Sequence, residues 1–422
     1  MEKNKLLLMF VFIVSLCLAF AAIAQDRGQP GAAGAADPAG RGPAAGRGMM
    51  GMGRGPAVRS PELLSDNKVT FRLSAPKASE VAVAGDWGTG MGSREAMTRD
   101  EQDVWSVTIG PLNPEFYGYT FSVDGVQVLD PANAQIKRDG TRNASVLLVP
   151  GAASDLYAVK DVPHGTLAKV WYDSPALNLK RRMYVYTPPG YESSSEKYPV
   201  FYLLHGGGGD EDAWTTLGRA PQILDNLIAH GKAKPMIVVM TNGNANQAAA
   251  QGDAPVSSSQ TPGGMGTPGA TPAARGGMTA MTAGGFENSL AKDVVPYIEK
   301  HYRVIADKDN RAVAGLSMGG GHTLRVTLDN PTMFGFIGVF SAGARNADDE
   351  MKKQFKVLKD ANPKLYYVGC GVDDTLAYAG SQTLEGILKE YDFKYIFRES
   401  SGGHTWANWR IYLSELAPLL FK

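Results

Sequence analysis

A serine stands between two glycines in the stretch Gly315-Leu316-Ser317-Met318-Gly319, which is a G-x-S-x-G pattern. The residues before it, 312–316, form a short apolar run that is typical of a buried strand. The residues after it predict a helix that ends at Asn330-Pro331. Ser317 is therefore expected at a sharp strand-to-helix turn, where its hydroxyl could act as a nucleophile. The alternative is a Gly-Ser loop that crosses a sheet edge.

A serine nucleophile needs a base, because a free hydroxyl is a poor nucleophile at neutral pH. Of the six histidines in the chain, His404 is the best candidate, since it follows two glycines in a loop before the last predicted helix. His322 lies on the helix directly after Ser317 and is too close in the sequence to swing back easily. The others open a glycine run, begin a domain or sit at predicted helix ends: His205, His164, His230 and His301.

A carboxylate must orient the histidine and stabilise its charged form. In α/β-hydrolases the order along the chain is serine, acid, histidine, so the acid is expected between Ser317 and His404. Asp373 and Asp374 follow a predicted strand within that interval. Asp374 is our first choice, and Asp373 remains the alternative.

The negative charge that develops on a carbonyl oxygen needs two backbone N–H donors. One is expected from Met318, directly after the nucleophile. The other is expected from the glycine run 206–209, where the backbone can face a substrate without a Cβ in the way. We name Gly207 as this donor. A phosphate-binding loop is the alternative, but no G-K-[ST] sequence follows the glycines.

These candidates need a scaffold, and from residue 164 onward predicted strands alternate with predicted helices. This pattern is typical of an α/β domain with a mostly parallel sheet. The predicted strands are 169–172, 181–187, 200–204, 236–241, 311–316, 336–341, 364–369 and 394–398. The predicted helices are 220–230, 289–302, 318–328, 349–359, 381–391 and 406–416.

The pattern is different in residues 58–150, where short runs such as 69–73 and 117–123 alternate between apolar and polar residues. Asp124-Gly125 supplies a hairpin turn. Several short strands with turns between them predict a β-sandwich. Trp87 could stack on a sugar ring, or it could be a core or turn aromatic. Since no catalytic candidate lies in this segment, we expect the α/β domain to work without it.

Residues 1–24 resemble a secretory signal, with two early lysines, an apolar stretch and the small-x-small site Ala22-Ile23-Ala24. A membrane anchor is the alternative, since the apolar run is nearly long enough to span. Residues 25–57 are dominated by Gly, Ala, Pro and Arg and predict a disordered linker.

Lysine and arginine together number 42, as do aspartate and glutamate, so the formal net charge is +0. This balance argues against nucleic acid or an anionic membrane surface as the main partner. The two cysteines are Cys17 and Cys370, and the first lies in the segment expected to be removed. We therefore expect no disulfide in the mature chain and no zinc site built on cysteine.

One segment interrupts the α/β pattern. Residues 244–285 are rich in Gly, Ala, Thr, Pro, Ser and Met and carry almost no charge. They follow the carboxyl end of a predicted strand, where α/β sheets bind ligands. The insert is expected to be either a mobile flap beside the site or a disordered surface loop.

The α/β half resembles the esterase D-like α/β-hydrolases, especially carbohydrate esterase family one, which contains feruloyl and acetyl xylan esterases. Enterobactin esterases are relatives of this group. The matching residues are 185–191, 203–208 with Trp214, 311–320, and 403–406 with Trp409-Arg410. Residues 58–150 resemble the immunoglobulin-like modules that precede catalytic domains in glycogen-branching enzymes and in two-domain esterases. The matching pieces there are 74–76, 85–87, 105–107, 117–124 and 130–133.

The resemblance implies an α/β-hydrolase fold after a β-sandwich and a secreted or periplasmic serine esterase. Its substrate would be plant polysaccharide carrying feruloyl or acetyl groups, with no cofactor and no stable membrane insertion after signal cleavage. A siderophore esterase or an acyltransferase on the same scaffold is the alternative, and an inert, glycan-binding protein is a third possibility. The implied site comprises the triad, the oxyanion donors and three substrate-binding residues: Ser317, Asp374 and His404; Gly207 and Met318; His205, Trp214 and Trp406.

Overall fold

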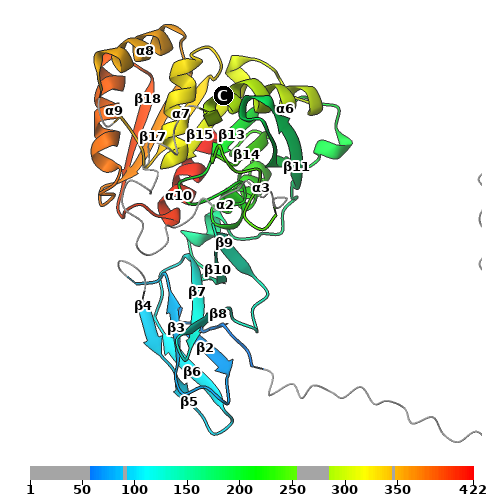
Figure 1. Cartoon of the computed structure of the whole chain (residues 1–422), viewed down its shortest axis with the longest axis vertical. Coiled ribbons are helices and arrows are strands. Elements are labelled where there is room, and N and C mark those ends of the chain that lie inside the picture. Colours follow the sequence, from blue (N-terminus) through cyan, green and yellow to red (C-terminus); the bar gives the residue numbers. More distant parts are fainter. Residues whose placement is uncertain (1–57, 89–92, 254–284, 345–346) are drawn as a thin grey trace, which may run out of the picture. The chain divides into compact units, whose positions relative to one another are not determined.

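The computed structural model describes residues 58–88, 93–253, 285–344 and 347–422. An all-β region comes first, and a region of alternating strands and helices follows it (Figure 1). The expected signal and linker, residues 1–57, lie outside the described residues. The same holds for residues 254–284 of the insert.

The all-β region consists of two antiparallel sheets, which confirms the predicted sandwich. One sheet has the order β1-β2-β6-β5: Glu62–Leu63, Val69–Ser74, Val104–Ile109 and Thr98–Arg99. The other has the order β4-β3-β7-β10-β9: Ser93–Ala96, Val81–Gly85, Phe116–Val123, Arg142–Leu148 and Ile136–Asp139. In that sheet β8 (Val126–Val128) pairs with β7. Alternating apolar residues of both sheets, such as Phe71 and Phe121, are fully buried in the core between them.

Trp87 is partly buried and packs against the core of this sandwich. Its ring stacks on Phe71 with centroids 5.4 Å apart and meets Tyr117 edge-on. The indole is partly buried and engaged by two core aromatics, so the placement favours the core aromatic over the sugar-stacking platform.

The second region is built on one sheet of eight strands in the order β11-β12-β14-β13-β15-β16-β17-β18. The strands are β11 (Thr166–Ser174), β12 (Leu179–Thr187), β13 (Val200–Leu204), β14 (Ile237–Thr241), β15 (Arg311–Leu316), β16 (Phe336–Phe340), β17 (Leu365–Gly371) and β18 (Tyr395–Ser400). The strands from β14 to β18 run parallel, and β11 and β12 are antiparallel additions at one edge. The predicted mostly parallel sheet is therefore confirmed.

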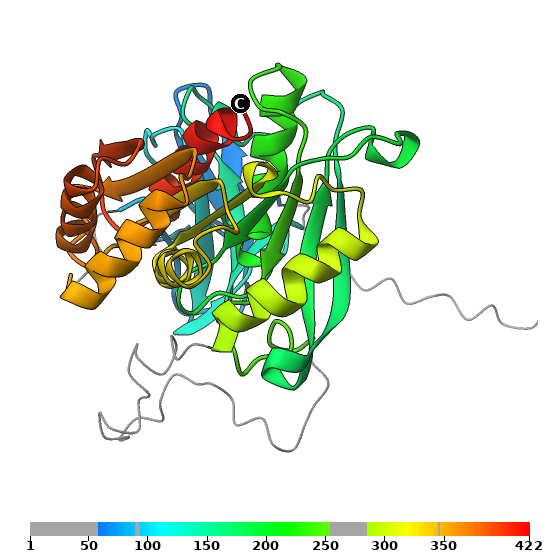
Figure 2. The ribbon, with the colours of Figure 1, turned by 90° about the horizontal axis from the view of Figure 1, so that it is seen from above.

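Helices cover both faces of this sheet (Figure 2), and central strands such as β13 and β16 are accordingly buried at every position. Phe201 and Leu203 pack on the side of α3 and α10, while Tyr202 and Leu204 pack on the side of α6. The helices are α2 (Ala213–Thr216), α3 (Ala220–Ala229), α5 (Gly285–Ser289), α6 (Val295–His301), α7 (Met318–Asp329), α8 (Asp349–Asp360), α9 (Tyr378–Glu390) and α10 (Trp406–Leu416).

The helix predicted over residues 289–302 is longer and less regular than expected. It begins at Gly285 and contains a π-helical turn, Leu290–Val294, between α5 and α6. Pro296 follows this turn and has no N–H to donate one turn back, so regular α-helical bonding is interrupted here.

The sandwich shares buried contacts with the α/β region, and residues Gly55–Lys422 form one compact unit. Phe116 and Val146 belong to the same hydrophobic cluster as the core residues of α3 and α10. Arg410 of α10 donates to Glu115 at 2.6 Å and to the carbonyl oxygen of Leu217 at 2.6 Å. These contacts argue against the expectation that residues 58–150 can be removed without consequence for the α/β domain.

The Glu115–Arg410 pair leads to a first prediction. The Arg410 side chain is 3% exposed, so Glu115→Ala would leave a buried guanidinium without its carboxylate. We expect this change to lower the free energy of unfolding by about 3 kcal/mol, measured by urea unfolding. Glu80→Ala is the matched control, because Glu80 pairs with Arg94 at the surface. That control should cost less than about 1 kcal/mol, and equal losses in the two variants would contradict the assigned role of the buried pair.

Candidate active site

Ser317 occupies a strained turn between the end of β15 and the start of α7. Its backbone has φ 50° and ψ −113°, a conformation that L-residues rarely adopt. The Ser317 N–H donates to the carbonyl oxygen of Phe340, the last residue of the neighbouring strand β16, at 2.8 Å. This placement is that of the predicted nucleophile elbow, in which the side chain projects from the carboxyl edge of the sheet.

The glycines around the serine allow α7 to approach the sheet closely. A Cβ on Gly315 would lie 2.3 Å from the carbonyl oxygen of Gly319, and one on Gly319 would lie 2.5 Å from that of His205. Both neighbours are backbone atoms, which cannot move aside as a flexible side chain can. The G-x-S-x-G pattern is therefore required by steric contact on both sides of Ser317.

An acid and an imidazole meet in the loops after β17 and β18. His404 Nδ1 and Asp374 Oδ2 are 2.8 Å apart. The Asp374 side chain is fully buried and also accepts the N–H groups of Leu376 and Ala377 at Oδ1. The His404 side chain is 23% exposed. The carboxylate is thus held rigidly, and the imidazole keeps one side open to solvent.

Asp373 has a different role in the same turn. Its carboxylate accepts the N–H of Gly402 at 3.2 Å, and its own N–H donates to the carbonyl oxygen of Gly402. Asp373 therefore ties the two loops together, and of the two candidate acids it is Asp374 that contacts the imidazole of His404.

The glycine loop 206–209 follows β13 and lies beside the serine. A Cβ on Gly206 would be 3.3 Å from the Cβ of Ser317. Nothing lies within 4 Å of the corresponding positions at Gly207 and Gly208, so the side of the backbone on which a Cβ would stand is open there. The N–H of Met318 lies in the first turn of α7, where backbone donors have no partner within the helix.

His205 supports this loop from below. Its Nδ1 lies 2.7 Å from the carbonyl oxygen of Gly206, and its Nε2 lies 2.7 Å from the backbone nitrogen of Gly243. Since the Gly243 N–H can only donate, Nε2 accepts and Nδ1 carries the proton, which makes the imidazole neutral. Burial lowers the pKa of His205 to about 4, which keeps the ring neutral near pH 7.

Two of the three expected substrate contacts are buried. His205 is 2% exposed and Trp214 is 1% exposed. The Trp214 indole N–H donates to the carbonyl oxygen of Leu204 at 2.9 Å, which anchors the end of β13. Both side chains therefore support the glycine loop, and their placement does not fit contact with a substrate. Trp406 is partly exposed and packs edge-on against Trp214 and Trp409.

The glycine loop and the three candidate catalytic residues all follow the carboxyl ends of parallel strands. The glycine loop follows β13, Ser317 follows β15, Asp374 follows β17 and His404 follows β18. Parallel strands end at one edge of the sheet, which is where α/β folds place their ligand sites. The sheet thus presents a candidate nucleophile, an acid–imidazole pair and a backbone loop on one edge.

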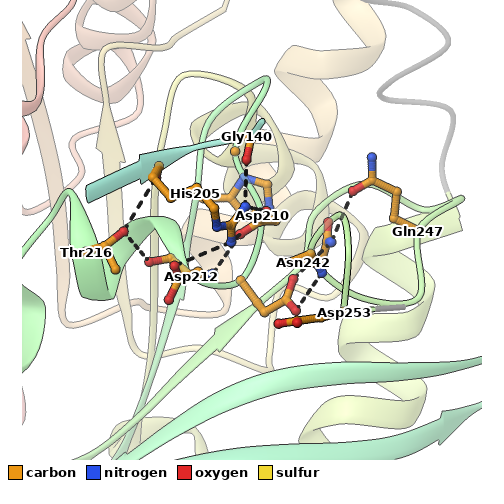
Figure 3. A network of polar contacts seen from close by, with 12 residues as sticks. Gly140, His205, Asp210, Asp212, Thr216, Asn242, Gln247 and Asp253 are labelled. Atoms are coloured by element: carbon orange, nitrogen blue, oxygen red, sulfur yellow. Dashed lines mark hydrogen bonds and ion pairs between the residues drawn. The ribbon is translucent and has the colours of Figure 1, made fainter. Parts of the chain in front are cut away.

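A buried polar network lies beside the glycine loop (Figure 3), and it was not predicted from the sequence. The carboxylate of Glu211 is 0% exposed and accepts from Arg182, from Asn242 and from the N–H of Ala250. Asn244 donates to the carbonyl oxygen of Gly209 at 2.9 Å. In the sequence, the acidic run 210–212 directly after the glycines is the signal that could have indicated this network.

The beginning of the insert differs from the expectation of a structureless segment. Residues 248–250 are buried, and the Ala248 carbonyl oxygen accepts the N–H of Arg182. Residues 244–253 are therefore packed against β12 and the glycine loop. The flap hypothesis for the remainder concerns residues 254–284, which lie outside the described residues.

Within the described ranges, no group of three or more His, Cys, Asp or Glu side chains is arranged to hold a metal ion. None of the helices in the same part of the chain is long and apolar enough to cross a membrane.

Curated relatives match most of the chain. An endo-1,4-beta-xylanase/feruloyl esterase of Xylanibacter ruminicola is 34% identical over 377 residues, which are 87% of this chain and 46% of that protein. Endo-1,4-beta-xylanase Y of Acetivibrio thermocellus is 24% identical over 297 residues, 64% of this chain and 24% of that protein. The match thus spans less than half the length of each of these relatives.

Solved structures show the same fold. A CE1 ferulic acid esterase from Anaeromyces mucronatus, in complex with ferulic acid, matches with a TM-score of 0.51 and 25% identity. The match covers 63% of this chain and 95% of that one. The enterobactin esterase of Shigella flexneri matches with a TM-score of 0.57 and 18% identity, over 83% of this chain and 92% of that one, and shows the fold alone.

Family models agree with both halves of this architecture. The model of carbohydrate-binding module 48, the isoamylase N-terminal domain, matches residues 55–134 and covers most of the sandwich. The Esterase model matches residues 174–419, which is more than half of the chain. The α/β-hydrolase fold and the residues gathered at the carboxyl edge of the sheet agree with this match, and the chain belongs to the Esterase family.

Proposed function

We propose that this protein is a serine carboxylic-ester hydrolase with Ser317 as nucleophile, His404 as base and Asp374 as the acid that orients it. The observation that carries the proposal is the 2.8 Å contact between His404 and the buried Asp374, at the same sheet edge as the strained Ser317 turn. A buried, immobile carboxylate selects the imidazole tautomer whose other nitrogen can accept a proton.

The reaction would proceed through an acyl-enzyme. His404 takes the proton of Ser317 as its oxygen attacks the ester carbonyl, and the N–H groups of Gly207 and Met318 stabilise the oxyanion. The alcohol leaves with the proton from His404. Water, activated in turn by His404, then hydrolyses the acyl-enzyme and releases the acid.

The substrate class is acylated plant polysaccharide, with feruloyl or acetyl groups as the acyl part. The relative that shares 34% identity over 87% of the chain is an endo-1,4-beta-xylanase/feruloyl esterase, which supports feruloyl groups on xylan as the first choice. The enterobactin esterase shares only the fold, so a siderophore ester is the weaker candidate. Since such polysaccharides lie outside the cell, a secreted or periplasmic location accords with the signal expected in residues 1–24.

Removing the nucleophile tests the reaction itself. We expect the protein to release ferulate from methyl ferulate and from feruloylated xylan faster than it opens a catecholate siderophore. Ser317→Ala should lower kcat by at least about a thousandfold on each ester while the melting temperature stays within a few degrees. A variant with a tenth of the original activity would rule out Ser317 as nucleophile, and a preference for the siderophore would replace the substrate class.

The two aspartates of one turn can be separated by amide substitutions. Asp374→Asn should reduce kcat by about a thousandfold or more, because the amide cannot stabilise the charged imidazole and favours the wrong tautomer. Asp373→Asn is the matched control and should change kcat by less than about tenfold, since the Asp373 carboxylate accepts the backbone N–H of Gly402. A larger loss in Asp373→Asn, measured on p-nitrophenyl acetate, would reassign the acid.

The buried His205 predicts a pH dependence of stability. The unfolded chain binds a proton on this imidazole near pH 6.5, while the folded protein resists protonation until about pH 4. Falling pH across this window therefore favours unfolding, by up to about 3 kcal/mol from this residue. Urea unfolding at pH 7 and pH 4.5 should show a smaller decrease for His205→Gln. The same decrease in both proteins would contradict the assignment of a neutral, buried His205.

A further inference from the structure

The glycine loop that carries the candidate oxyanion donor has few contacts of its own. Nothing lies within 4 Å of a Cβ placed on Gly207 or Gly208, so side-chain packing does not hold these residues. Glycine backbones are conformationally permissive, yet an oxyanion donor must be fixed before the charge develops. The loop must therefore be held from its ends, and His205 holds the first end through Gly243.

The second end is held by an arginine from the sandwich. Arg138 on β9 donates to both carboxylate oxygens of Asp210, which directly follows the loop, at 2.6 and 2.8 Å. A third contact of 3.4 Å reaches Asp212. The Asp210 side chain is 5% exposed and that of Arg138 is 21% exposed, so this is a shielded, two-pronged pair and not a surface ion pair.

The tip of the β9–β10 hairpin touches the glycine loop directly. Gly140 has φ +59°, and a Cβ placed on it would lie 2.5 Å from the carbonyl oxygen of Gly208. Arg138 also donates to the carbonyl oxygen of Gly140 at 2.7 Å, so one side chain fixes both the tip and Asp210 (Figure 3). The glycine loop is thus bounded by a backbone contact from the β-sandwich.

We propose that the β9–β10 hairpin of the sandwich is part of the esterase machinery, with Arg138 as a positioning residue that fixes loop 206–209 through Asp210. The proposal rests on the function proposed above. The sandwich then acts on kcat, through the geometry of the Gly207 N–H, and not only on substrate capture. Ester binding in the ground state does not require this geometry, so KM should be largely insensitive to it.

The test compares Arg138→Ala with Lys137→Ala in the full chain. Lys137 is the matched control, because it is a cation on the same strand that pairs with Asp86 inside the sandwich. On p-nitrophenyl acetate we expect Arg138→Ala to lose about ten- to a hundredfold in kcat with KM within about twofold. Lys137→Ala should stay within about twofold in both constants. Arg138→Lys keeps the positive charge but loses the planar, two-pronged guanidinium, so its kcat should lie between those of Arg138→Ala and the unmodified protein.

A second measurement reports on the oxyanion loop itself. A p-nitrophenyl phosphonate phosphonylates a serine nucleophile: the Ser317 oxygen attacks phosphorus, the P–O bond to p-nitrophenolate breaks, and His404 takes the serine proton. The phosphoryl oxygen of the adduct then occupies the oxyanion position. The rate of inactivation should fall in Arg138→Ala by about the same factor as kcat. Gly140→Ala should also slow inactivation without a change of charge, because its Cβ would push against Gly208. This variant keeps the proposal testable if Arg138→Ala is poorly folded.

The outcomes separate this proposal from the proposed function. Inactivation of Arg138→Ala and Gly140→Ala at the rate of Lys137→Ala would overturn the positioning role while Ser317 remains the nucleophile. If the loss of kcat in Arg138→Ala equals the fraction of that variant that is unfolded, as determined from thermal melting, Arg138 has only a structural role and the positioning role is likewise overturned. If Ser317→Ala is still modified by the phosphonate, the proposed function itself is wrong.

Discussion

The site depends on how closely helix α7 approaches strands β13 and β15. The backbones meet at two glycines, since a Cβ on Gly315 or Gly319 would lie within 2.5 Å of a carbonyl oxygen. Between these two glycines Ser317 has a positive φ, a conformation that costs roughly 1–3 kcal/mol. The strain persists because the strands on either side are buried on both faces and the Ser317 N–H is bonded to Phe340.

The loop beside the serine has the opposite requirement. Its glycines leave open the side of the backbone that the proposed mechanism turns toward the substrate carbonyl, but they provide no side chains with which to hold the shape of the loop. The surrounding structure supplies the constraints: His205 through Gly243, Asn244 through the carbonyl oxygen of Gly209, and Arg138 through Asp210. A preorganised donor needs no rearrangement as charge develops, so under the proposed mechanism these contacts would affect the rate more than the binding of substrate.

Local patterns predict most of the α/β scaffold. The strands expected at 200–204 and 311–316 and the helix expected at 406–416 have the bounds of β13, β15 and α10. A continuous apolar run or a helical period lies within about a dozen consecutive residues, so it can be recognised without knowing which other segments it packs against. The sharp turn at Ser317 follows in the same way, because the glycines that permit it are its neighbours in the chain.

Local patterns are thus sufficient for the order of the elements, the expected turn at Ser317 and a short list of candidates for base and acid. Which aspartate faces His404 depends on tertiary packing, because both lie in one turn and the packing of two loops brings Asp374, and not Asp373, to the imidazole. Burial likewise made His205 and Trp214 supports of the glycine loop. The contact of Arg138 with Asp210 joins residues 72 positions apart, and no local pattern encodes which charges meet across such a distance.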